Sequence, residues 1–154
     1  MRLWAALYLA IWVVFLEFLL AMIPFAQPLL TYLHAGLGVV IVALAYSNYA
    51  NLRQTTVPGR LKRVSQVTLA LAVLVVVLGP LLLFNVGAGW SVVGAITVWN
   101  LLLFVHVVNA FAVLTQMAAV AVAYDMWEEK EFLEETRPGE IPRNPSSRPA
   151  KPAR

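Results

Sequence analysis

The chain has 154 residues, of which 61% are hydrophobic and 12% are charged, and its formal net charge is +3. Soluble domains carry about 25% charged residues, so this composition excludes an ordinary soluble protein and favours one surrounded by lipid. The chain contains no cysteine, which excludes disulfides, iron–sulfur clusters, thiolate ligands and covalently attached c-type haem. The small positive charge gives no reason to expect a nucleic-acid partner.

Four apolar segments are each long enough to cross a membrane, which takes about 20 helical residues. They run from Leu3 to about Phe25, from Leu29 to about Asn51, from Val64 to about Asn85, and from a start within Ser91–Asn100 to about Tyr124. We therefore expect an all-α integral membrane protein in which residues 1–127 form a four-helix up-down bundle in the lipid bilayer.

The charges between these segments are unevenly placed. The predicted loop from Arg53 to Arg63 carries four basic residues and no acid, whereas the Pro24–Pro28 and Asn85–Trp90 loops carry no charge. Basic loops are retained on the cytoplasmic side of a membrane. This pattern predicts that both termini are cytoplasmic (N-in/C-in), and we expect the plasma membrane of a prokaryote.

The character of the chain changes after the fourth segment. Residues 128–137 are rich in glutamate and predict a cytoplasmic extension of the last helix, and residues 138–154 combine prolines with basic residues, which is typical of a disordered tail. An acidic extension and a flexible tail beyond apolar spans suggest docking against other membrane subunits. We expect a respiratory complex as the partner.

Two histidines, His34 and His106, are the only ones in the chain and lie within apolar segments. His34 lies 19 residues before Arg53, and His106 lies 19 residues before Asp125. At about 1.5 Å per residue, both lie about 28 Å from the cytoplasmic boundary, near the outer edge of the bilayer core. Polar side chains at such depth usually mark function.

The second and fourth helices are diagonal in an up-down bundle, and this matters for what two histidines could bind. Adjacent helix axes lie about 8–10 Å apart, too close for a porphyrin between two imidazoles, but the diagonal gap is wider. The geometry favours one haem b per chain, with His34 and His106 as metal ligands. Zinc is less suitable, because two histidines without clustered carboxylates or thiolates fall short of its usual four ligands.

Three neighbouring residues and one acid complete the predicted site. Gly36 and Gly38 follow His34 and leave room for a flat macrocycle, although glycines also simply allow helices to pack closely. Asn109 lies three residues after His106, on the same helix face. Glu17 is the only charged residue between Leu3 and Leu52. It either supports a ligand histidine, exchanges a proton with a quinol or redox centre, or bonds a neighbouring helix.

These motifs resemble one half of the haem A synthase family. The similarity covers about residues 29–124: His34-Ala-Gly-Leu-Gly, the basic Arg53–Arg63 loop, the Gln66–Gly79 segment and His106. Members consist of four-helix halves with a histidine on the second and fourth helix of each, so the resemblance implies that His34 and His106 are axial ligands. The acidic residue expected just outside the first helix is absent from Pro24–Pro28, so we do not expect synthase activity.

Three functions remain open at this stage. The first is a membrane b-type cytochrome that transfers electrons near the outer face, as a subunit of a respiratory complex and with quinol as a further candidate partner. The second is a haem A synthase-like enzyme that modifies haem. The third is a structural subunit without a cofactor. We expect an electron-transfer or accessory subunit rather than an independent enzyme, and we assign no catalytic residue.

Overall fold

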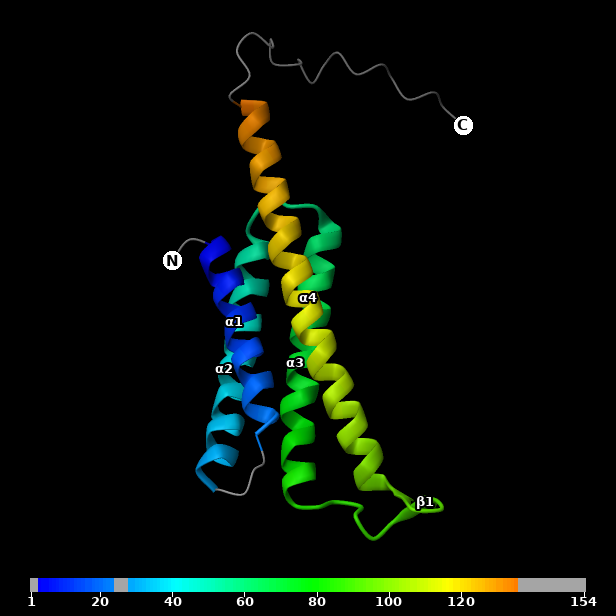
Figure 1. Cartoon of the computed structure of the whole chain (residues 1–154). Helices are drawn as coiled ribbons and strands as arrows, with labels where there is room; N and C mark the ends of the chain where they lie inside the picture. The colour runs from blue at the N-terminus through cyan, green and yellow to red at the C-terminus, as the bar shows by residue number, and fades with distance from the viewer. Residues whose placement is uncertain (1–2, 24–27, 136–154) are drawn as a thin grey trace, which may run out of the picture.

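The structure is a computed structural model, and it describes residues 3–23 and 28–135. Four helices dominate it: α1 (Leu3–Ala21), α2 (Pro28–Arg53), α3 (Gly59–Leu83) and α4 (Val98–Glu135) (Figure 1). Each of them is long and apolar enough to cross a membrane, as the sequence predicts. Large apolar side chains are exposed along all four helices, which is the surface expected for contact with a lipid bilayer.

Two helix ends and one connection differ from the prediction. α1 ends at Ala21, before Phe25, and α3 begins at Gly59, so that part of the expected basic loop is helical. Between α3 and α4 the chain forms a small hairpin of β1 (Ser91–Val93) and β2 (Ile96–Thr97), which we had not predicted. α4 continues to Glu135, in line with a helical extension, whereas the tail at 138–154 lies outside the described residues.

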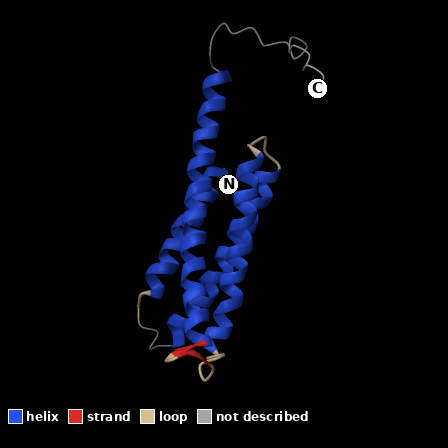
Figure 2. Ribbon diagram, turned by 90° about the vertical axis from the view of Figure 1, so that its right-hand side faces the viewer, coloured by secondary structure: helices blue, strands red, loops and turns tan. Residues whose placement is uncertain are grey.

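Each helix packs against two neighbours. α1 contacts α2 and α4, and α3 contacts α2 and α4, so α2 and α4 occupy diagonal positions. The α2–α3 connection lies at the same end as the start of α1 and the extension of α4 (Figure 1). The hairpin lies at the opposite end (Figure 2). Trp99 Nε1 donates a hydrogen bond of 3.2 Å to the Leu82 carbonyl and joins α4 to the end of α3 there.

The buried residues follow one stripe along each helix. Leu78 on α3 is buried outside this stripe. The stripe residues on α2 are Ile41, Ala45, Asn48 and Leu52, on α3 Leu61, Ser65, Thr68 and Ala72, and on α4 Val113, Met117, Val120, Ala121 and Tyr124. This alternation of three and four residues is the spacing of helices that pack with a left-handed supercoil. These inner stripes fill the half of the bundle next to the α2–α3 connection, where Thr68 Oγ1 also bonds Gln116 Oε1 at 3.0 Å.

We predict that the free energy of unfolding depends on close packing at the inner-stripe positions. Ala121 on α4 is 1% exposed and belongs to the buried cluster, whereas Ala123, two residues later, is exposed. Ala121→Leu should lower the free energy of unfolding by about 1–3 kcal/mol, because a well-packed interior must shift to accept a larger side chain. Ala123→Leu should leave it nearly unchanged. Unfolding in mild detergent measures both, and equal losses would contradict the assignment.

Candidate functional site

The inner stripe continues into the other half of the bundle, but the residues on it change. Proceeding from the packed half, α2 carries Gly38, His34 and Thr31, and α4 carries Ala110 and His106 at the same three- and four-residue steps. α1 contributes Glu17 and Ala21, and α3 contributes Val75 and Gly79. The stripes of this half therefore include two glycines, two histidines and an acid, whereas the buried residues of the packed half include none of these types.

A cavity of about 320 Å³ results, lined by all four helices. This volume lies within the range of about 300–1,000 Å³ that is typical of ligand sites. The lining is apolar apart from four residues, namely Glu17, Thr31, His34 and His106. The cavity reaches Ala21, Pro80 and Leu83 near the hairpin end of the bundle. Binding sites for largely apolar ligands have a mostly apolar lining with a few polar groups, and this cavity has that composition.

The two histidines meet across this cavity from the diagonal helices. The centres of their imidazole rings lie 6.3 Å apart, and the ring planes are inclined by 52°. His106 Nδ1 is buried and has no hydrogen-bond partner among the residues that the structure describes. Because a buried polar atom without a partner is costly, this nitrogen needs a ligand or a water that the protein itself does not supply.

Glu17 also lies in the cavity and contacts one of the histidines directly. Its Oε1 lies 2.8 Å from His34 Nδ1, a close contact at ion-pair distance between α1 and α2. The second carboxylate oxygen, Oε2, is buried and has no hydrogen-bond partner in the described part of the chain. Because His34 lies on the neighbouring helix α2, this contact fits two of the three roles open from sequence for Glu17, support of His34 and a bond to a neighbouring helix.

The residues predicted to surround the histidines divide into two groups. Gly38 lines the cavity, and a Cβ at this position would lie 3.4 Å from Val76 Cγ2 on α3. Gly36 and Asn109 are not among the lining residues: a Cβ on Gly36 would meet nothing within 4 Å, and Asn109 donates a hydrogen bond of 2.8 Å to the Val105 carbonyl of its own helix. The expectation that these two residues border the ligand finds no support.

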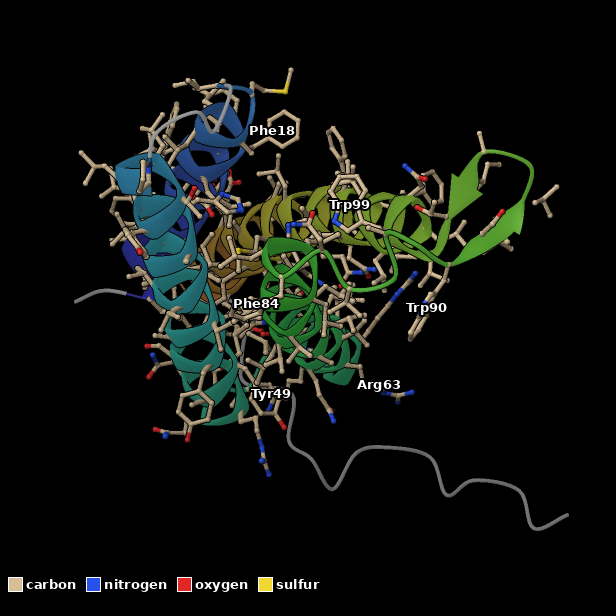
Figure 3. The ribbon with its side chains drawn as sticks, turned by 90° about the horizontal axis from the view of Figure 1, so that it is seen from below. Phe18, Tyr49, Arg63, Phe84, Trp90 and Trp99 are labelled. Atoms are coloured by element: carbon tan, nitrogen blue, oxygen red, sulfur yellow. The ribbon has the colours of Figure 1, made fainter. Side chains whose placement is uncertain are left out.

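Sequence reasoning missed several of the lining residues. Val75, Gly79 and Pro80 of α3 border the cavity, as does Phe18 of α1. The Phe18 ring packs on Phe111 of α4 with 4.7 Å between ring centres. Figure 3 views the bundle from the hairpin end and places Phe18 on α1. The three- and four-residue steps from Ala72 and Val14 would have identified Val75, Gly79 and Glu17 as inner positions.

No site for a bare metal ion is apparent beside this cavity. Within residues 3–23 and 28–135, no three His, Cys, Asp or Glu side chains are grouped so that they could hold a metal ion.

Comparisons of the chain with protein-family models, with curated proteins and with solved structures found no match. The function is therefore inferred from the cavity and its residues.

We predict that the Glu17–His34 contact couples α1 and α2 energetically. In a double-mutant cycle of Glu17→Leu and His34→Leu, the coupling energy should be about 0.5–2 kcal/mol, the range for hydrogen bonds between membrane helices. Glu17→Leu combined with Asn109→Leu should be additive, because Asn109 bonds within its own helix. Unfolding free energies in mild detergent give both values, and additivity of the first pair would show that the contact contributes nothing.

Proposed function

We propose that the chain is a membrane b-type cytochrome that binds one haem between His34 and His106 and transfers single electrons. The observation that carries this proposal is the separation of the two imidazole rings, whose centres lie 6.3 Å apart. A metal–imidazole bond is about 2 Å long and the ring centre lies about 1 Å behind the bonding nitrogen, so two imidazoles on opposite sides of one metal have centres about 6 Å apart.

Other features of the cavity fit a haem as well. Its apolar lining suits the face of a porphyrin. Gly38 and Ala110 keep the space beside the two rings clear of side chains.

The protein's part in the chemistry follows from these residues. When bound, haem supplies a reversible one-electron change at its iron. His34 and His106 would both hold the haem iron, and two such protein ligands suit electron transfer rather than the binding of oxygen or a substrate. The apolar side chains around them keep water away from the centre. These features favour an electron carrier over a haem-modifying enzyme.

We further propose an up-down bundle with both termini in the cytoplasm, in the plasma membrane of a prokaryote. The four basic residues Arg53, Arg60, Lys62 and Arg63 lie at the α2–α3 end of the bundle, and this supports a cytoplasmic position for that end. The cavity then lies towards the outer face. The α4 extension beyond the bundle suits docking to other subunits, and a respiratory assembly remains the proposed partner.

Replacement of either histidine tests the proposal most simply. His34→Ala and His106→Ala should each abolish the low-spin haem spectrum or convert it to a high-spin one, because the iron would lose an axial bond. Phe104→Ala is a matched control, since Phe104 lies two residues from His106 on α4 and is 66% exposed. An unchanged low-spin spectrum in both histidine variants would refute the ligand assignment.

A second test uses the two glycines. Gly38→Leu should place a side chain in the cavity and reduce the haem content per chain at least several-fold, because the macrocycle and the side chain would compete for one volume. Gly36→Leu should retain haem, since Gly36 lies outside the lining and has open space beside it. Haem content of the two purified variants is measured by the pyridine haemochrome. Full haem content in Gly38→Leu would place the haem elsewhere.

A further inference from the structure

We propose that Glu17 is a positioning residue that fixes the orientation of His34 and strengthens its bond to the oxidised metal, and so lowers the reduction potential of the centre. This inference rests on the proposed function and concerns the inequality of the two ligands. Glu17 would thereby influence the reduction potential of the site.

The two side chains are in close contact at ion-pair distance. Glu17 Oε1 lies 2.8 Å from His34 Nδ1, which is within the usual range for a bond between an imidazole N–H and a carboxylate. The side chains are only 13% and 28% exposed, respectively. Little water competes for either group, so the interaction is stronger than it would be at a protein surface.

The chemistry of imidazole links this contact to metal binding. A neutral imidazole carries a proton on one nitrogen and a lone pair on the other, so donation from Nδ1 to Glu17 leaves the lone pair on Nε2 for the metal. A carboxylate that accepts this proton's hydrogen bond holds the ring in one orientation and makes its other nitrogen a better electron donor. Glu17 would therefore act on the metal through His34 without touching it.

The second histidine lacks this support. Among the described residues the one ion-pair contact of Glu17 is with His34, whereas the His106 ring has a hydrogen bond with the backbone of Val75 instead. The two histidine ligands would therefore differ in donor strength. α1 packs against both α2 and α4, and at this level its Glu17 contacts the histidine of α2.

The consequence for the reduction potential has a defined sign. The oxidised metal carries one more positive charge than the reduced metal, and a stronger donor with a carboxylate behind it stabilises that charge more. Loss of the carboxylate should therefore favour reduction and raise the potential. Partners that hold ligating residues in this way typically change metal affinity about 10–100-fold when they are mutated.

The experiment compares Glu17→Gln with the wild-type chain, both purified with haem. Gln keeps the size of Glu but removes its charge, and we expect the preference for the oxidised state to fall about tenfold, which is about +59 mV for one electron. Glu17→Asp keeps the charge on a shorter side chain, so its reduction potential should differ less from that of the wild-type chain than the potential of Glu17→Gln does. Leu16→Ala is the control, because Leu16 is the adjacent residue on α1 and is 55% exposed.

Two readouts separate the possible outcomes. A spectropotentiometric titration gives the potential, and the electron paramagnetic resonance g-values of the oxidised protein report the donor strength of the axial ligands. We expect both to change in Glu17→Gln and neither in Leu16→Ala. Haem-bearing wild-type and Glu17→Gln chains with the same potential and g-values would refute this inference alone. A wild-type chain that binds no haem would refute the proposed function, and the inference with it.

Discussion

The inner stripe of each helix is the constraint on which the rest of the structure depends. Residues at alternating steps of three and four face the bundle axis on all four helices, and their size decides what the interior holds. Where large residues such as Leu52, Val113 and Met117 alternate with small ones such as Ala45 and Ala72, the interior is filled. Where the stripe residues are Gly38, Ala110 and the ionisable Glu17, His34 and His106, a cavity opens. The same spacing of residues therefore positions both the packed core and the cavity.

This division also explains how a cavity can persist in a bundle surrounded by lipid. Lipid provides no hydrophobic drive to close it, and helices in membranes associate mainly by close packing and hydrogen bonds. The packed half, with buried residues such as Leu52 and Ala121, holds the helices together. The open half depends on the Glu17–His34 contact and on ring packing between Phe18 and Phe111. A ligand between the histidines would add the missing contacts.

Much of the arrangement could be predicted from the sequence, and the failures have physical causes. The four apolar helices were predictable because length and hydropathy suffice, and equal distances from the charged ends anticipated the approach of His34 and His106. Gly36 was predicted because it follows His34, and Asn109 because it lies on one helix face with His106, yet neither lines the cavity that Gly38 and Ala110 border. The 91–97 hairpin was missed because its short apolar run resembles the start of a helix.

The absorption spectrum of the purified wild-type chain tests the central claim most directly. We expect one haem b per chain, low-spin in both the oxidised and the dithionite-reduced state. Carbon monoxide should not change the spectrum, because both histidines would hold the iron. A chain purified from haem-replete cells without any haem absorption would contradict the account. So would a high-spin haem that binds carbon monoxide, because the two histidines would then not share the iron.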